Sequence, residues 1–287
     1  MVQKHIEKIP KRRDDSHKGD YGKVFVLAGS RGMTGAAYLT CQGALRAGSG
    51  LVINGIASSL NPIMEAKLTE ALTLPLPVNK KFSLSVKSVK SILSFAESCD
   101  VAVVGPGLGR EAETFKVVRA VVAKLGCPLV LDADGINALQ GNMRLLRRRN
   151  IRTVITPHPG EMARLIRKEV SHVQLQRVEV AKHVAQGTGA IVCLKGHRTV
   201  VADPDGQVYI NETGNSGMAT GGTGDVLAGM IASFIGQGLD DYSAAISAVY
   251  LHGLAGDIAA EHKGPFSLIA TDLLEYLPHA FKKAGLF

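Results

Sequence analysis

The segment of the chain best suited to chemistry is the glycine-rich run 215–225, which leads into an apolar helical pattern. Glycines let the backbone approach a ligand closely, and the helix N-terminus adds unpaired N–H donors and a partial positive charge. The expected anion hole is made of Gly221, Gly222, Thr223 and Gly224. Asp225, in the first helical turn, would accept a proton from a hydroxyl while the hole steadies a moving phosphoryl group.

A simpler interpretation of this segment stays open. A glycine-rich loop could merely enter a helix, with Asp225 as an ordinary capping residue. The number of glycines and the polar lead-in at 211–215 favour the functional interpretation.

Short apolar runs alternate with helical patterns along the chain. The strands and helices that they predict must hold segment 215–225 in position. The predicted strands are 23–28, 51–54, 101–104, 129–131, 153–155 and 190–194. The predicted helices between and after them are 35–47, 84–97, 112–125, 160–167 and 173–186. This rhythm predicts an α/β fold with three αβα layers and a mostly parallel central sheet.

In the C-terminal half, the alternation of single strands and helices stops. A β-hairpin is expected at 199–202 and 207–210, because the sequence Asp-Pro-Asp-Gly between them favours a tight turn. Three helices are expected to follow, at 225–235, 242–261 and 270–283. The prolines and lysines between residues 75 and 81 are interpreted as a long loop. We expect one domain over 1–287, with 1–15 as a basic, flexible arm.

Five loops carry candidate ligand-binding residues directly after predicted strands. They are 29–36, 105–110, 132–135, 156–161 and 195–199. Ligands of such sheets bind outside the carboxyl ends of the strands. Each loop alone is weak evidence, since strand-to-helix loops are glycine-rich for steric reasons. Five loops on one edge, together with the anion hole, are hard to explain by packing.

Individual residues of these loops have alternative roles. His158 lies between two prolines, so it would be a rigidly held donor to a substrate or a loop histidine that caps the backbone. Asp132 and Asp134 could orient a hydroxyl or a hydrated magnesium ion, although helix capping by Asp134 is equally compatible. Lys195 would bind a nucleotide or be a plain surface lysine. Neither a Walker P-loop nor a Gly-x-Gly-x-x-Gly fingerprint is present, because Arg110 replaces the last glycine.

The amino-acid composition favours a globular protein with a large core over a nucleic-acid-binding or membrane-spanning protein. The 287 residues are 46% hydrophobic and 20% charged, which is enough for a large core. The net charge is +8, but basic clusters at 11–13 and 144–149 lack interleaved aromatic residues, so nucleic-acid binding is not expected. No apolar run is long enough for a membrane span, and the polar N-terminus does not resemble a secretion signal. Four scattered cysteines fit buried thiols in the cytoplasm, with no disulfide and no metal site.

Together the motifs resemble the ribokinase-like superfamily, and within it the NAD(P)H-hydrate dehydratases. The resemblance covers nearly the whole chain and is carried by six segments: 17–22, 28–36, 105–109, 156–161, 194–196 and 214–225. The combination of His-Pro-Gly-Glu with Gly-Gly-Thr-Gly-Asp is specific to this family among its kinase relatives. The chain would correspond to the form without an attached epimerase domain.

The resemblance implies a substrate, a co-substrate and a set of site residues. The substrate would be the S form of hydrated NADH or NADPH, which has water added across the nicotinamide ring. ADP or ATP, accompanied by Mg²⁺, would drive its dehydration. Substrate contacts would come from Ala36, Gly107, His158 and Asp225. Nucleotide contacts would come from Lys195, Gly196, His197, Arg198, Thr199 and Gly224.

The resemblance also implies partners and leaves alternatives. A homotetramer and a functional link to an NAD(P)H-hydrate epimerase are expected, with no nucleic-acid or membrane partner. The alternative on the same fold is a small-molecule kinase acting on a vitamin-precursor alcohol, which would release a stable phosphorylated product. A third alternative is a non-catalytic binder of nucleotides or nucleic acid that uses the basic clusters.

Overall fold

The computed structural model describes residues 2–286, and its centre is a mixed β-sheet. The strand order is β3-β2-β1-β4-β5-β6-β7-β8-β9. Strands β1 to β7 run parallel, and β8 and β9 are antiparallel to their neighbours. The strands are β1 (Lys23–Leu27), β2 (Leu51–Ala57), β3 (Leu72–Leu76), β4 (Val101–Val104), β5 (Leu129–Leu131), β6 (Thr153–Ile155), β7 (Ile191–Leu194), β8 (Val200–Ala202) and β9 (Val208–Ile210).

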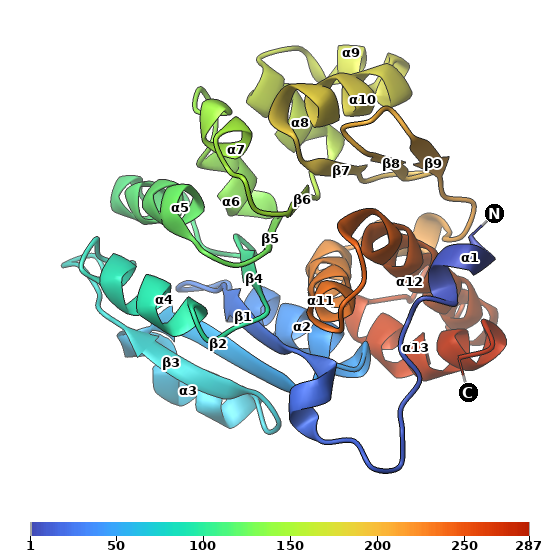
Figure 1. Cartoon of the computed structure of the whole chain (residues 1–287), viewed down its shortest axis with the longest axis horizontal. Coiled ribbons are helices and arrows are strands. Elements are labelled where there is room, and N and C mark those ends of the chain that lie inside the picture. The colour runs from blue at the N-terminus through green and yellow to red at the C-terminus, as the bar shows by residue number, and fades with distance from the viewer. Residues whose placement is uncertain (1, 287) are drawn as a thin grey trace.

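Helices cover both faces of the sheet, so the predicted three-layer αβα fold with its antiparallel hairpin is confirmed (Figure 1). One layer contains α2 (Thr34–Arg46), α11 (Thr223–Gly236), α12 (Asp241–Lys263) and α13 (Ala270–Lys283). The other contains α4 (Ser88–Ala96), α5 (Ala112–Lys124), α7 (Arg144–Arg147) and α10 (Arg177–Thr188). Shorter helices are α1 (Gln3–Ile6), α3 (Asn61–Lys67), α6 (Ala133–Asn137), α8 (Pro159–Ile166) and α9 (Val170–Leu175).

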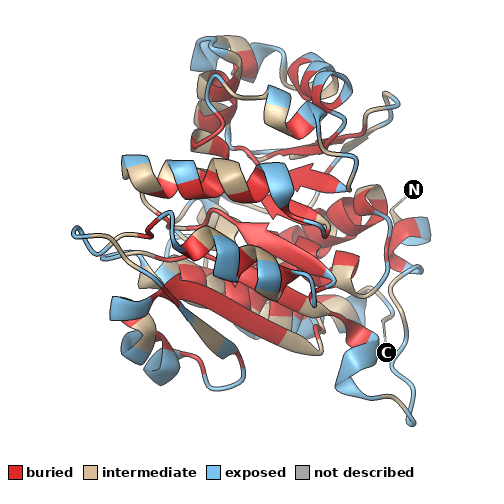
Figure 2. Cartoon of the chain, turned by 60° about the vertical axis from the view of Figure 1, so that its left-hand side comes forward, coloured by how far each residue is buried: buried red, intermediate tan, exposed pale blue. Residues whose placement is uncertain are grey.

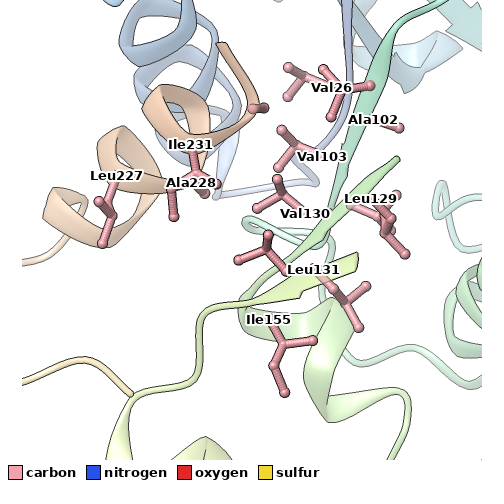
Figure 3. Close-up of a cluster of buried hydrophobic side chains, with 14 of the residues drawn as sticks. Val26, Ala102, Val103, Leu129, Val130, Leu131, Ile155, Leu227, Ala228 and Ile231 are labelled. Carbon is pink, nitrogen blue, oxygen red and sulfur yellow. The ribbon is translucent and has the colours of Figure 1, made fainter. Parts of the chain in front are cut away.

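The sheet is buried between the layers, while the helices expose their outer faces (Figure 2). Val103 and Val130 are fully buried, as expected for parallel strands covered on both sides. Figure 3 shows Leu227, Ala228 and Ile231 of α11 beside the central strands β4 and β5. The packing of this apolar face on β4 and β5 fixes where the first turn of α11 lies.

Two glycines let α2 and α11 pack with their backbones in contact. A Cβ atom on Gly43 would lie 2.4 Å from the carbonyl oxygen of Val226, and one on Gly229 would lie 2.1 Å from that of Thr40. Only glycine fits at such distances. The two helices are therefore fixed against each other.

Three local predictions were wrong. The segment around Pro75 is not entirely loop, because Leu72–Leu76 forms the edge strand β3, where a proline is tolerated. The helix predicted at 173–186 is two helices, α9 and α10, separated at Gln176. The helix predicted from residue 84 begins only at Ser88, since Ser85 and Val86 are bound by the Glu113 side chain.

Part of the basic excess serves the fold. Arg149 donates to the carbonyl oxygens of Val122, Leu125 and Cys127, and it thereby ties the end of α5 to the loop after α7. Arg12 lies 4.1 Å from the ring centroid of Tyr21 and binds a backbone carbonyl. In the N-terminal segment, α1 buries Ile6.

The four cysteines are all buried free thiols, as predicted. Among the described residues, no helix is both long enough and apolar enough to traverse a bilayer.

Candidate functional site

The five loops selected from the sequence lie at one edge of the sheet. They follow β1, β4, β5, β6 and β7, which are consecutive parallel neighbours, so their carboxyl ends share an edge. Segment 17–22 differs, because it precedes β1 and lies at the opposite edge, where His17 caps a 3₁₀ turn. This segment of the resemblance therefore lies away from the candidate site, and its observed contacts are those of a capped turn.

The first turn of α11 reaches this edge next to Lys195. A Cβ atom on Gly224 would lie 3.1 Å from Lys195 Nζ, so glycine leaves the space that the ammonium group occupies. Lys195 Nζ in turn donates to Asp132 Oδ1 over 2.6 Å. The Asp132 side chain is 1% exposed and that of Lys195 is 18% exposed. Lys195 is therefore not a plain surface lysine.

Three carboxyl groups surround this lysine: Asp132, Glu161 and Asp225. Burial opposes the charge of Lys195, but Asp132 and Glu161 outweigh it, so the pKa of Lys195 is raised. Burial also raises the pKa of Glu161, and the negative charge of Asp132 adds to this effect.

Asp225 has the ionisation expected of a general base. Burial raises the pKa of Asp225 to about 7, with a further increase from Asp132 and an opposing effect from Lys195. A catalytic carboxylate is most effective when its pKa lies near the working pH. Asp225 would therefore both hold a hydroxyl and take its proton near neutrality.

The loop before Asp225 has the geometry of an anion site. Gly222 has φ +96° and forms the N-cap of α11 without a side-chain cap. Within residues 2–286, the N–H groups of Thr223 and Gly224 find no protein acceptor. The Thr223 hydroxyl donates to the carbonyl oxygens of Met218 and Thr220, which fixes the loop. The free N–H groups and the positive end of a 14-residue helix favour a bound anion.

A cavity of about 420 Å³ opens beside this loop. Its lining includes every residue that the resemblance assigned to the nucleotide: Lys195, Gly196, His197, Arg198, Thr199 and Gly224. Positive charge is supplied by Lys195 and Arg198, and apolar surface by Met218, Leu227 and Val249. The size and the mixed lining suit a nucleotide.

Several residues of this region were not found from the sequence. His252 of α12 lines the cavity, and its Nε2 donates to the carbonyl oxygen of Thr223 over 2.9 Å. Burial lowers the pKa of His252 to about 4, so the ring is neutral. Asp257 accepts from the Gly214 N–H and the Asn215 side chain. The only sign of this role for His252 in the sequence was the presence of a histidine within an otherwise apolar helical pattern.

His158 performs one of its two expected roles in the structure. Its Nδ1 accepts from the Gly160 N–H, and Glu161 accepts from the His158 N–H, which completes a capping box at α8. Because Nδ1 accepts, the neutral ring carries its proton on Nε2. Burial, with the charge of Lys195, lowers the pKa of His158. Nε2 lies 3.4 Å from Glu161 Oε1, and a contact of His158 with a substrate would use this Nε2–H group.

Ala36 and Gly107 meet at the start of α2, and neither lines the 420 Å³ cavity. Gly107 has φ +59°, and a Cβ atom there would lie 2.8 Å from Ala36 Cβ. A side chain at 107 would therefore both strain the backbone and fill the space beside Ala36.

The carboxyl groups of Asp132 and Asp134 both bind other groups of the protein. Asp134 accepts from the Gly109 N–H, Arg110 and Asn137, and Asp132 is paired with Lys195. In the described part of the chain, no cluster of three or more metal-binding side chains occurs. Mg²⁺ commonly binds through nucleotide phosphates, water and only one or two carboxylates, and this arrangement would fit the site.

A family model and the relatives found by comparison with known proteins all indicate the same family. The family model described as NAD(P)H-hydrate dehydratase matches residues 24–279. The ADP-dependent (S)-NAD(P)H-hydrate dehydratase of Neisseria meningitidis is 37% identical over 92% of the chain and 84% of that protein. The bifunctional NAD(P)H-hydrate repair enzyme Nnr of Moorella thermoacetica is 44% identical over 96% of the chain. The chain spans about half the length of that relative, 52%.

A solved structure agrees with these relatives. The ADP/ATP-dependent NAD(P)H-hydrate dehydratase from Bacillus subtilis, co-crystallised with ATP and Mg²⁺, matches with a TM-score of 0.83 and 32% identity. The match covers 99% of this chain and 97% of the other. The chain therefore belongs to the NAD(P)H-hydrate dehydratase family, on a ribokinase-like fold.

Proposed function

We propose that this protein dehydrates the S form of hydrated NADH or NADPH. ADP or ATP would supply the driving force, giving the reduced dinucleotide, AMP or ADP, and phosphate. The observation that carries the proposal is that Asp225, with a pKa of about 7, directly follows two free backbone N–H groups beside a nucleotide-sized cavity. The names of the relatives support the same activity.

The proposed reaction begins with transfer of a phosphoryl group. The ring hydroxyl of the substrate loses its proton to Asp225 and attacks the terminal phosphorus of the nucleotide. The bond from that phosphorus to the bridging oxygen breaks, and the shorter nucleotide leaves. The N–H groups of Thr223 and Gly224 stabilise the negative charge on the phosphoryl oxygens.

Elimination would follow. The phosphorylated oxygen leaves as phosphate, a far better leaving group than hydroxide, because the electron pair of the ring nitrogen assists its departure. Loss of a proton from the adjacent ring carbon restores the ring double bond. One water, added earlier across the ring, is thus removed as part of the phosphate.

The residues have separate tasks in this proposal. Lys195 and Arg198 hold the nucleotide phosphates and ribose region, with Gly196, His197, Thr199 and Gly224 shaping the cavity. Ala36, Gly107 and the Nε2–H of His158 position the substrate ring at Asp225. Mg²⁺ would enter with the nucleotide and neutralise its phosphates.

Product analysis tests this function. Purified protein is incubated with hydrated NADH and either ADP, ATP or no nucleotide, and dihydronicotinamide absorbance and free phosphate are measured. We expect both to rise together, and only with nucleotide. A stable phosphorylated alcohol without free phosphate would instead identify a kinase, and absence of any reaction would contradict the proposal.

The remaining expectations concern the whole protein. We propose a single domain over the chain, a homotetramer and a cytoplasmic site of action. A functional partnership with an NAD(P)H-hydrate epimerase is supported by relatives named as bifunctional repair enzymes, which are about twice as long. Light scattering after gel filtration tests the tetramer directly.

A further inference from the structure

A buried histidine of α12 is bonded to the first residue of α11. His252 is 8% exposed, and its Nε2 lies 2.9 Å from the carbonyl oxygen of Thr223. A carbonyl oxygen only accepts, so Nε2 carries the ring proton and donates. Burial lowers the pKa of His252 to about 4. The ring therefore stays neutral at neutral pH, and the Nε2–H group is a permanent donor to Thr223.

This hydrogen bond acts on the peptide group that joins Thr223 to Gly224. A trans peptide group is planar, so its C=O and N–H bonds lie in one plane and point in opposite directions. Because His252 holds the C=O bond on one side, it also fixes the direction of the Gly224 N–H bond on the other. The Gly224 N–H group is one of the two donors of the anion site that find no acceptor within residues 2–286.

The two donors of the anion site are held by different side chains. The Thr223 hydroxyl donates to the carbonyl oxygens of Met218 and Thr220, which fixes Thr223 and its own N–H group. Gly224 has no side chain with which to fix itself. Within the described part of the chain, His252 is the only side chain that forms a hydrogen bond to the peptide group carrying the Gly224 N–H.

The same hydrogen bond also makes the Gly224 N–H group a stronger donor. A peptide group that accepts at its oxygen becomes more polar, and hydrogen bonds linked in a chain strengthen one another by roughly 10–30% each. The chain here runs from the His252 ring through the peptide group to an anion bound at Gly224. His252 therefore affects both the direction and the strength of this donor.

Helix α12 is itself fixed to the loop that it supports. Asp257 accepts from the Gly214 N–H group over 2.8 Å, and the Thr213 hydroxyl donates to the carbonyl oxygen of Tyr250 over 2.8 Å. These contacts lie on either side of His252 along the helix. The imidazole is therefore presented to Thr223 from a rigid support, as a positioning group requires.

We propose that His252 is a positioning residue of the anion site. It holds the peptide group between Thr223 and Gly224 so that the Gly224 N–H points at the transferring phosphoryl group and stabilises the charge that develops there. The proposal rests on the proposed function. His252 also lines the nucleotide cavity, but in this role it acts through the backbone and not through a contact with the nucleotide.

Two substitutions of His252 and a matched control test this role. His252→Leu removes the donor and keeps a side chain of similar size. His252→Gln restores a donor, because the glutamine Nε2 is separated from Cα by the same number of bonds as the histidine Nε2. The control is His5→Leu, since His5 is also 8% exposed and its Nδ1 lies 2.9 Å from Ser243 Oγ, near the start of the same helix.

Two quantities are measured for each variant: the single-turnover rate of dehydration of hydrated NADH at saturating ADP, and the Kd for AMP. For His252→Leu we expect the rate to fall by about thirtyfold, somewhat less than for loss of a whole oxyanion donor. The Kd for AMP should not change, because AMP lacks the transferring phosphoryl group, and this also shows that the variant is folded. His252→Gln should recover most of the rate, and His5→Leu should match wild type.

Three results would overturn the proposal. The first is an unchanged rate in His252→Leu, or a rate in His252→Gln as low as in His252→Leu. The second is a loss of AMP affinity as large as the loss of rate, which would show that His252 contacts the nucleotide directly. The third is an equal loss of rate in His5→Leu, which would attribute the effect to the packing of α12. Failure of the proposed function is distinct from all three, because wild type itself would then not dehydrate hydrated NADH.

Discussion

Lys195 Nζ lies 2.6 Å from Asp132 Oδ1, although 63 positions separate the two residues. The pair joins the ends of β5 and β7 beneath the first turn of α11. Lys195 is thereby held toward Asp132 and Glu161, and Asp225 keeps a raised pKa despite a nearby cation. The ion pair thus sets both the position of Lys195, the proposed phosphate-binding group, and the ionisation of the proposed base.

The ion pair should contribute measurably to stability. Lys195→Met leaves the buried Asp132 carboxylate without its partner, and we expect a loss of about 3 kcal/mol in the free energy of unfolding. The double variant Asp132→Asn/Lys195→Met removes both charges and should regain at least half of that loss. Urea unfolding measures all variants. Additive losses in the double variant would show that the two groups are not coupled.

The pH dependence of the reaction should follow Asp225. The carboxyl group must be ionised to accept a proton, and burial raises its pKa to about 7. We therefore expect kcat/KM for hydrated NADH to rise about tenfold per pH unit below this value and to level off above it. Initial rates from pH 5.5 to 8.5 at low substrate concentration measure this. A flat profile between pH 6 and 8 would exclude Asp225 as the titrating base.

The same raised pKa should destabilise the folded protein at high pH. Because the folded-state pKa exceeds the unfolded value, stability is fully present below about pH 4 and falls until about pH 7. Asp225→Asn does not titrate, so its Tm should exceed that of wild type by about 5 °C at pH 8 and by less at pH 5. Thermal unfolding at the two pH values measures the difference. A gap that is independent of pH would contradict the raised pKa.

Two adjacent glycines provide a matched test of the anion loop. Gly222 has φ +96°, and a Cβ atom there would lie 2.4 Å from Leu39 Cδ1. Gly221 has open space within 4 Å of its hypothetical Cβ atom. We expect Gly222→Ala to lower kcat by about a hundredfold, the scale for loss of one oxyanion donor. Gly221→Ala should retain most activity, since its N–H group and surroundings are unchanged. Equal effects of the two changes would contradict the importance of loop geometry.

The sequence allowed prediction of the layers and of the site's edge because both follow from local patterns. Continuous apolar runs such as 101–104 mark strands buried on two faces, and parallel strands end at one edge. The partner of Lys195 could not be predicted, because pairing across 63 positions depends on how three strands pack. His252 was missed for the same reason, since α12 reaches the anion loop only in the folded protein.

Edge strand β3 shows the limit of local rules. Pro75 argues against a central strand, so the segment around it was interpreted as a loop. However, β3 lies at the open edge of the sheet, where the missing N–H group of a proline is tolerated. Whether a strand is central or peripheral is a property of the sheet and not of the segment. A cavity of about 440 Å³ outside β1, β2 and β3 was not predicted either, because the loop after β3, which carries Phe82, helps to line it.

Turnover by Asp225→Asn tests the central claim most directly. Asparagine keeps the shape of the side chain and one acceptor oxygen but cannot take up the proton. Dehydration of hydrated NADH with ADP should fall at least about a thousandfold, within the range for general-base removal, while the Kd for ADP stays close to the wild-type value. Turnover within tenfold of wild type would show that Asp225 is not the base and would contradict this account of the site.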